Sequence, residues 1–521
     1  MEIVAAETVE TGRLQEQARL DSLKTAAERN KWGQFATPPS LSLSIARYAR
    51  TLMGNAPVRF LDPAVGTGSF YSALSQVFPP ASITAAAGIE LDALFAKSAA
   101  ALWGERGLTV IEGDFTRQHP PERRFNLVLT NPPYVRHHHL STAEKDRLRA
   151  QLAQSLHLDI SGLAGLYCYF LLLSHDWMED GGLAVWLIPS EFMDVNYGAT
   201  LRRYLAERVT LLHIHRFCPT DVQFTDALVS SAVVVFRKSP PSSSHTARFS
   251  FAGPIEHPRT EAQVPLEHLR QSRKWTQFPG RTTVENTGEI TLGDIFAIKR
   301  GLATGSNGFF ILTEADIENW DIPLQFMKPI LPGPRHVTGD VVDALTSGAP
   351  DVSPRLYLLD CSEPEERIKA AWPRFYQYLR RGRDQNIHEA YLASHRDPWY
   401  SQENRPPAPF LCTYMGRSRD GKDPFRFIWN RSHATAHNVY LMLYPKGPLQ
   451  RALKKYPELE ANVFEALQAI APAALLAEGR VYGGGLHKVE PKELAHIPAG
   501  RVLESIERHV RIERQAPMLF T

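Results

Sequence analysis

The chain has only four cysteines in 521 residues, and it has no long apolar run. The cysteines are scattered without paired spacing, which predicts neither a disulfide framework nor a zinc site. The longest apolar stretch, residues 163–173, is too short to cross a bilayer. The N-terminus carries acidic residues in place of an apolar signal sequence. We therefore expect a cytoplasmic protein with no membrane association and no bound metal.

A strong excess of one charge is also missing. The 58 Lys and Arg residues nearly balance the 56 Asp and Glu residues, which leaves a formal charge of +2. There is thus no global signal for nucleic acid, and any basic binding surface must be local. The length predicts two domains, each able to bury its own core.

Short apolar runs alternate with helical segments from Val58 to Lys238, which predicts parallel βαβ units. The expected strands are residues 58–61, 83–89, 109–112, 127–130, 183–188, 209–215 and 231–236. They indicate an α/β fold with a doubly wound, mostly parallel seven-stranded sheet, similar to a Rossmann sheet.

A Pro/Ser stretch at residues 239–244 is typical of a linker, and the alternating rhythm is lost beyond it. We therefore expect a helical, charged lead-in over residues 1–30 and a first domain over residues 31–240. A second domain of mixed α+β character is expected over residues 245–521.

The most informative residues are Asn131-Pro132-Pro133-Tyr134, directly after an expected buried strand. Such a turn suits methylation of an exocyclic amino group, whose lone pair is delocalised into the ring. The Asn131 side-chain oxygen and the Pro132 carbonyl could accept from the amino group and favour a localised lone pair. The prolines hold these acceptors rigid, and the Tyr134 ring offers a face for a planar base.

A Gly-rich turn marks the expected cofactor site. Asp62 ends the first expected strand and precedes Gly66-Thr67-Gly68. The turn lacks the Gly-Lys-Ser/Thr end of a phosphate loop and the third glycine of a dinucleotide fingerprint. A carboxylate just before the glycines disfavours a phosphate and favours a cationic ligand. The sulfonium and ammonium groups of S-adenosylmethionine fit.

Acidic residues also end the next two expected strands. Glu90 could hold both ribose hydroxyls of a nucleoside. Asp114 could accept from the adenine amino group while Phe115 packs on the ring. Any one of these carboxylates alone is equally well explained as a helix N-cap or a surface charge. Three in order before an Asn-Pro-Pro-Tyr turn favour a cofactor site.

These motifs resemble the S-adenosylmethionine-dependent DNA methyltransferases that modify adenine N6. Residues 33–38 resemble the family segment that closes over the methionine end of the cofactor. In the gamma group of this family, the closing segment precedes the Gly-rich turn and the recognition region follows at the C-terminus, which is the order found here. The gamma group includes many methyltransferases of type II restriction–modification systems. The resemblance implies a cofactor site formed by Thr37, Asp62, Ala64, Gly66, Gly68, Glu90, Asp114, Phe115 and Asn131.

The resemblance further implies that residues 245–521 form a DNA target-recognition domain. Phe224 matches the family aromatic that stacks on a flipped-out adenine, opposite Tyr134. The expected reaction is direct methyl transfer to adenine N6 in double-stranded DNA, with no catalytic histidine. It would protect a site from a cognate restriction endonuclease that the chain does not bind. We expect a monomer.

Local basic clusters are candidate DNA contacts. Those in the expected second domain are Arg273, Lys274, Arg381, Arg383 and Arg417, and a solvated face explains them equally well. The run 137–139 consists of three histidines, but consecutive residues rarely converge on one metal ion. We expect this run to lie in a loop along the DNA or cofactor cleft.

Three alternatives stay open from the sequence. Asn-Pro-Pro-Tyr also occurs in enzymes that methylate an exocyclic amine of RNA or a protein glutamine, although such chains generally lack a second domain this large. A non-catalytic recognition subunit is a second alternative, against which the intact acidic residues argue. A fused restriction nuclease is a third, and the roughly 30 residues before the cofactor domain are too few for a nuclease domain.

Overall fold

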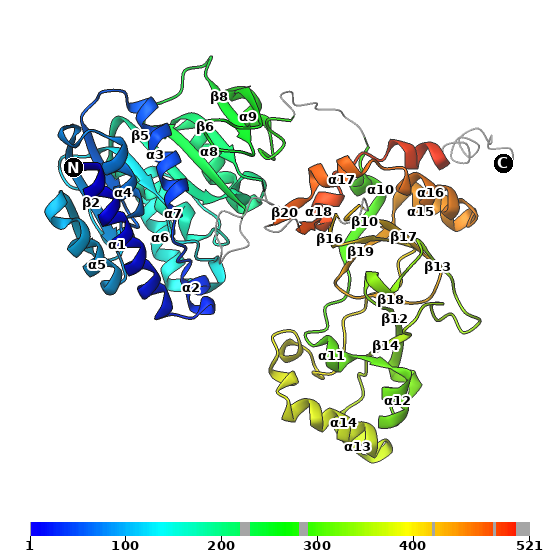
Figure 1. Cartoon of the computed structure of the whole chain (residues 1–521). Coiled ribbons are helices and arrows are strands. Elements are labelled where there is room, and N and C mark those ends of the chain that lie inside the picture. Colours follow the sequence, from blue (N-terminus) through cyan, green and yellow to red (C-terminus); the bar gives the residue numbers. More distant parts are fainter. Residues whose placement is uncertain (1, 219–229, 281–289, 419–422, 483–485, 507–521) are drawn as a thin grey trace. The chain divides into compact units, whose positions relative to one another are not determined.

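The structure is a computed structural model that describes residues 2–218, 230–280, 290–418, 423–482 and 486–506. It divides into two compact units (Figure 1). The first comprises Met1–Asn286 and Tyr482–Gly484, and the second comprises Thr287–Val481 and Gly485–Thr521. In the described part of the chain, no helix is both long enough and apolar enough to cross a membrane.

The first unit is built on a nine-stranded sheet with the order β3-β2-β1-β4-β5-β7-β6-β8-β9 (Figure 1). Strands β1 to β5 pair in parallel, whereas β7 is antiparallel to both of its neighbours. The strands are β1 (Val58–Asp62), β2 (Ile83–Glu90), β3 (Leu108–Glu112), β4 (Phe125–Thr130), β5 (Met178–Pro189), β6 (Thr210–Arg216), β7 (Ser231–Arg237), β8 (Thr246–Phe251) and β9 (Thr260–Pro265).

Helices cover both faces of this sheet. They are α1 (Glu2–Ser22), α2 (Ala26–Trp32), α3 (Pro39–Met53), α4 (Ser69–Val77), α5 (Ala93–Trp103), α6 (Thr142–Leu156), α7 (Leu166–Leu173), α8 (Ala199–Glu207) and α9 (Leu266–Gln271). Alternate residues of a strand point to opposite faces. On β4, Leu127 and Leu129 therefore join the core formed with α3, α4 and α5, whereas Val128 joins the core formed with α6, α7 and α8. This burial on both faces explains the continuous apolar runs of the central strands.

The expected doubly wound α/β fold is confirmed, and all seven expected strands are present. The sheet is larger than expected because β8 and β9 continue it beyond the Pro/Ser stretch. β8 pairs in parallel with β6, and β9 pairs antiparallel with β8. The division between the units therefore falls after Asn286 rather than at residues 240–245. The expected lead-in over residues 1–30 also belongs to the first unit, because α1 contacts α4 and α5.

The second unit has the expected mixed α+β character. Its sheets have the orders β10-β19-β15-β17-β13, β11-β14-β12-β18 and β16-β21-β20. The strands are β10 (Phe296–Arg300), β11 (Ile311–Thr313), β12 (Met327–Leu331), β13 (Val341–Val342), β14 (Leu356–Leu359), β15 (Phe410–Thr413), β16 (Met415–Arg417), β17 (Phe427–Asn430), β18 (Thr435–Ala436), β19 (Tyr440–Pro445), β20 (Arg480–Tyr482) and β21 (Leu486–Lys488). The helices are α10 (Leu292–Ile295), α11 (Asn307–Phe310), α12 (Glu314–Trp320), α13 (Glu365–Ala371), α14 (Pro373–Asp384), α15 (Gly447–Lys455), α16 (Leu459–Gln468), α17 (Pro472–Glu478) and α18 (Pro491–Leu494).

Candidate active site

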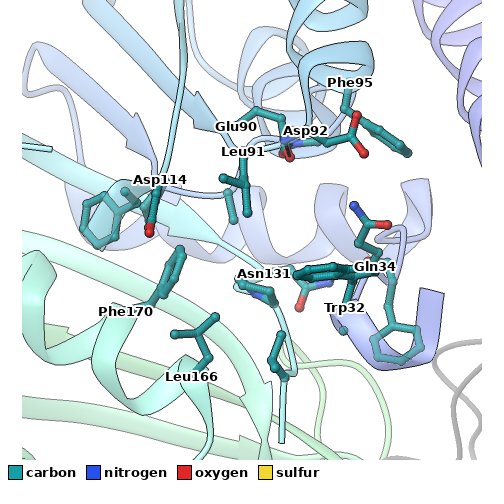
Figure 2. Close-up of a pocket in the computed structure, with 18 of the residues that line it drawn as sticks. Trp32, Gln34, Glu90, Leu91, Asp92, Phe95, Asp114, Asn131, Leu166 and Phe170 are labelled. Atoms are coloured by element: carbon teal, nitrogen blue, oxygen red, sulfur yellow. Dashed lines mark hydrogen bonds between the residues drawn. The ribbon is translucent and has the colours of Figure 1, made fainter. Parts of the chain in front are cut away.

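The strand order reverses between β1 and β4, and a cavity lies at this point. In open α/β sheets, ligands bind at the carboxyl ends of the strands where the order reverses. The cavity has a volume of about 810 Å³ and is lined by residues that follow β1, β2, β3 and β4. Residues from α1, α2 and α7 complete its walls, and Figure 2 shows several of them.

The cavity brings together many of the residues expected from the sequence. Those that line it are Ala64, Gly66, Glu90, Asp114, Phe115, Asn131 and Pro133. Other expected residues lie next to these along the chain but do not line the cavity, namely Thr37, Asp62, Gly68, Pro132 and Tyr134.

Asn131 follows β4 and has one fixed orientation. Its Nδ2 donates to the Phe35 carbonyl oxygen at 3.0 Å and to Thr37 Oγ1 at 3.1 Å. A carbonyl oxygen can only accept, so the nitrogen of the amide must face Phe35. The Asn131 Oδ1 atom is consequently left buried and without a hydrogen-bond partner. An orphaned acceptor of this kind is costly unless a ligand donates to it.

A close backbone contact places residues 33–38 over the turn. The Tyr134 amide donates to the Gly33 carbonyl oxygen at 3.1 Å. Gly33 has a φ of +63°, and a Cβ atom at this position would lie 2.3 Å from the Tyr134 nitrogen. Only glycine permits both the conformation and the approach. The expected closing segment thus lies against the Asn-Pro-Pro-Tyr turn and supplies both partners of the Asn131 amide.

The Tyr134 ring is buried rather than exposed to the cavity. Its hydroxyl donates to the Leu187 carbonyl oxygen at 3.1 Å, and its ring contacts those of Phe35 and Tyr167. Burial raises the pKa of this hydroxyl above its usual range. Tyr134 therefore stays neutral and has a fixed ring orientation.

Two carboxylates lie near the Gly-rich turn, and of these Asp62 is buried and Glu90 is half-buried. Asp62 is 1% exposed and accepts from Thr130 Oγ1 at 2.7 Å and from the Ala64 amide at 3.1 Å. Glu90 accepts from the amides of Gly66 and Asp92, both at 2.9 Å. Burial raises the pKa of Asp62 to about 7 and also raises the pKa of Glu90. A cation in the cavity would favour the charged form of both groups.

Asp114 and Phe115 begin the short 3-10 helix η3 (Phe115–Arg117). Asp114 Oδ1 accepts from the Thr116 amide and hydroxyl, so the carboxylate is an N-cap as well as a residue of the cavity wall. Phe115 is 2% exposed and packs against Phe170 and Trp177. Its ring supports the wall from the core of the unit.

Sequence reasoning did not identify several apolar residues of the cavity wall. Leu91 and Trp32 are 63% and 53% exposed, which is high for large apolar side chains, and both line the cavity (Figure 2). Phe170 lines it from α7. Leu91 directly follows the acidic strand end at Glu90, and Trp32 directly precedes Gly33, so each was adjacent to a recognised motif.

The remaining candidates have different outcomes. Phe224 lies outside the described residues. Residues 137–139 form the 3-10 helix η4 (His137–His139), and His139 lines the cavity, as expected for a cleft loop. Within the described ranges, no group of three or more His, Cys, Asp or Glu residues is arranged to hold a metal ion.

The basic candidates are not gathered in one unit. Arg273 and Lys274 belong to the first unit, not to the expected second domain, because that domain begins later. On α14, Arg383 donates to Glu365, and the Arg381 guanidinium lies 5.8 Å from the Trp320 ring centroid. Arg417 is exposed at the end of β16. The Arg383 ion pair favours the solvated-face interpretation for that residue.

The cavity fits S-adenosylmethionine, the cofactor expected from the sequence. Acids with raised pKa values suit a cationic ligand, and the carboxylate of Glu90 faces the cavity where a ribose could be held. Leu91 and Phe170 offer apolar surface for a planar ring. The unpartnered Asn131 Oδ1 suits an amino-group donor next to the cofactor.

Comparisons with known proteins find methyltransferases of restriction–modification systems. The family model described as Type II methyltransferase M.Eco57I, C-terminal domain, matches residues 281–516. The model described as Eco57I restriction-modification methylase matches residues 99–223. The chain is 28% identical over 450 residues to the Type II methyltransferase M.XamI of Xanthomonas campestris pv. amaranthicola, and the match covers 85% of this chain and 80% of that protein. It is 22% identical over 490 residues to the Type II methyltransferase M.AccI of Acinetobacter calcoaceticus, and this match covers 89% and 85%.

A solved structure shows the same fold. The Type IIL restriction-modification enzyme MmeI, determined in complex with DNA, has a TM-score of 0.56 and 12% identity to this chain. The match covers 96% of this chain and 79% of that one. A family model matched in each half of the chain and relatives aligned over most of their length support a type II restriction–modification DNA methyltransferase, and its cofactor is S-adenosylmethionine.

Proposed function

We propose that the chain methylates the N6 amino group of an adenine that is flipped out of double-stranded DNA. One observation carries this proposal: the buried, unpartnered Asn131 Oδ1 at the end of β4. An exocyclic amino group is the donor that this acceptor lacks. The orientation of the amide is set by Phe35 and Thr37, so the acceptor is in place before any substrate arrives.

The residues of the turn would act by position and electrostatics. The cofactor, when bound, supplies an electrophilic methyl group. Asn131 Oδ1 and the Pro132 carbonyl would accept from the two amino hydrogens and direct the nitrogen lone pair out of the ring plane. Holding the nitrogen in line with the methyl group removes most of the entropic barrier. The amino proton becomes acidic only after the new bond forms, so no strong general base is required.

We further propose that Tyr134 and Phe224 contact opposite faces of the flipped base. Unstacking a base costs a few kcal/mol, which contacts with aromatic rings offset. The hydrogen bond from the Tyr134 hydroxyl to Leu187 fixes that ring in one orientation, which supports this role. Phe224 enters the proposal from the sequence resemblance alone.

The second unit would recognise the DNA target. It contains most of the match to the family model of the M.Eco57I C-terminal domain, which covers residues 281–516. The proposed biological role is to protect a recognition site from a cognate endonuclease. We also propose that the enzyme belongs to the gamma group, on the order of its motifs, and that it is a monomer. In the second unit, Arg381 is the proposed phosphate contact, and Arg417 is proposed to read base edges.

Incubation with labelled S-adenosylmethionine and plasmid DNA, followed by digestion to nucleosides, tests the substrate. We expect the label in N6-methyladenine. Recovery in N4-methylcytosine would show that the base is wrong. Label in tRNA, rRNA or protein but not in duplex DNA would show that the proposed substrate is wrong.

Asn131→Ala tests the site itself. We expect kcat to fall by about 100-fold or more, the range typical of removing one catalytic hydrogen-bonding group. Asn55→Ala is a matched control, because Asn55 is exposed and its side chain accepts only a 3.3 Å hydrogen bond from Arg50. Wild-type kcat in Asn131→Ala would refute the role of Asn131.

A further inference from the structure

Helix α1 presents a stripe of polar residues to the cofactor site. Glu10, Arg13, Gln17, Asp21 and Lys24 recur every three or four positions, a spacing that places side chains on one face of a helix. Lys24 lies just beyond the end of the helix, and the last three of these residues line the cavity. A polar face of a helix normally faces water, whereas this one contacts the residues of the cofactor cavity.

Arg13 is the buried centre of this stripe. It is 1% exposed and is among the largest fully buried side chains of the described residues. Its guanidinium donates to both carboxylate oxygens of Glu10, at 2.8 and 2.6 Å. Its Nη1 donates to Thr67 Oγ1 at 3.1 Å. A buried guanidinium is unfavourable unless it is paired and hydrogen-bonded, so the Thr67 bond fixes both partners.

Thr67 is the central residue of the Gly66-Thr67-Gly68 turn. Its hydroxyl accepts from Arg13 and donates to Gln17 Oε1 at 2.7 Å. Its carbonyl oxygen accepts from Trp103 Nε1 at 2.8 Å. The neighbouring Gly66 amide donates to Glu90. The hydroxyl of Thr67 therefore connects α1 to the turn that carries the cofactor site.

Lys24 makes a second connection at the other end of the helix. Its ammonium forms an ion pair with Asp92 and donates to Gln34 Oε1 at 2.9 Å. Asp92 is the N-cap of α5 and its amide donates to Glu90, and Gln34 lines the same cavity as Asn131 (Figure 2). Arg29 donates to the carbonyls of Asp21 and Lys24 and fixes the connection to α2. Lys24 thus links three parts of the cavity wall, namely the end of α1, the segment after β2 that contains Asp92, and the segment that contains Gln34.

We propose that α1 is part of the cofactor site, in which Arg13 is a positioning residue for the Gly-rich turn and Lys24 holds the cavity walls together. The helix precedes residues 31–238, the range over which the sequence resembles known methyltransferases with specific motifs. The proposal concerns the affinity for S-adenosylmethionine and does not depend on which base is methylated. If α1 proved to have no effect on cofactor affinity, the proposed adenine methylation would still stand. If adenine proved not to be the substrate, the role of α1 in cofactor binding would still stand.

Calorimetric titration of the DNA-free protein with S-adenosylmethionine tests the proposal. Arg13→Met and Lys24→Met should each raise the Kd about tenfold, the effect of losing one or two buried hydrogen bonds to charged groups. Arg19→Met is the matched control, because Arg19 lies on the same helix, is 57% exposed and forms an ion pair with Glu16. A Kd equal to that of Arg19→Met in both test variants would overturn the proposal.

Thr67→Val and Thr67→Ser provide a test that leaves the Arg13–Glu10 pair intact if Arg13→Met fails to fold. The valine removes the hydroxyl with little change in volume, and the serine restores it. We expect Thr67→Val to raise the KM for S-adenosylmethionine about tenfold with kcat at saturation and KM for DNA within about twofold, and Thr67→Ser to recover most of the loss. An unchanged KM in Thr67→Val, or a loss confined to thermal stability, would show that α1 has only a structural role.

Discussion

A chain of hydrogen bonds within the first unit should make its stability depend on pH. His213 and His215 are both 0% exposed on β6, and both contact Ser250 Oγ, at 2.7 and 2.8 Å. His213 also contacts the Tyr48 hydroxyl, and His215 contacts the Gly253 carbonyl oxygen. Burial, together with the nearby Arg248, lowers the pKa of His213 to about 2 and that of His215 to about 4, although the bond to Gly253 raises the pKa of His215 in part.

The sign and size of the effect follow from these values. The unfolded chain binds protons at a pKa of about 6.5, whereas the folded chain keeps both imidazoles neutral to much lower pH. The stabilisation is therefore complete above pH 6.5 and is lost as the pH falls below it. At pH 5, about 1.5 units below the unfolded pKa, each histidine should lower the free energy of unfolding by about 2 kcal/mol, or about 4 kcal/mol for both.

Urea titrations at pH 7.5, 6 and 5, followed by hydrogen exchange of peptides from residues 210–216, measure this loss locally. The control is the His213→Gln/His215→Gln double variant, which keeps amide hydrogen-bonding groups but cannot titrate. We expect the wild type to lose about 4 kcal/mol more than the double variant between pH 7.5 and 5, because other groups that titrate in this range, such as Asp62, are present in both proteins. An equal loss in both proteins would refute the assignment to these histidines. Because β6 leads into the segment that contains Phe224, the same acid loss should also reduce methyl transfer.

Three further changes test the site and the DNA surface. Gly33→Ala should reduce methyl transfer strongly and lower stability by at least about 1 kcal/mol, since the Cβ atom would lie 2.3 Å from the Tyr134 nitrogen; Gly107→Ala is also in the left-handed region, with its nearest contact at 3.4 Å, and measures the cost of the dihedral in thermal unfolding. Leu91→Ala should weaken S-adenosylmethionine binding about tenfold by calorimetry, whereas Leu94→Ala, which is also exposed but lies outside the cavity, should not. Arg381→Ala should weaken binding to all DNA sequences alike and reduce the salt slope by about 1, and a change confined to one base position would contradict a phosphate contact.

The sequence predicted the central sheet well because its strands are buried on both faces. Residues 127–130 form a continuous apolar run only because one face of β4 packs on α3 and α4 and the other on α6 and α7. The edge strands lack this signal. In β8, buried Ala247 and Phe249 alternate with more exposed residues, and a Pro/Ser stretch precedes them, so the local pattern indicated a linker and a new domain. The pairing of β8 with β6 is a long-range contact that no local pattern encodes.

A site residue could be predicted from the sequence where its local context allows few roles for its side chain. Asn131 after a buried strand and before two prolines has a restricted set of roles, and the structure leaves its Oδ1 without a partner. Asp114 was ambiguous because the same carboxylate can cap a helix and line a cavity, and it does both. The polar stripe of α1 could not be distinguished from a solvated face, because Arg13 is recognised as functional only when Thr67 is found beside it.

The distribution of satisfied and unsatisfied polar atoms explains how this cavity can favour one reaction. Glu90, Asp114 and the Asn131 amide nitrogen already have donors or acceptors within the protein, so the walls need little rearrangement when a ligand binds. Among the expected site residues that the structure describes, the side-chain atom that is buried and left unpartnered is Asn131 Oδ1. An acceptor that is fixed beforehand stabilises charge developing on a nearby N–H more in the transition state than in water, because no reorganisation is needed at the moment of reaction. The energetic cost of burying Oδ1 without a partner is therefore offset only when an amino group occupies the position next to it, which makes binding and methyl transfer depend on the same contact.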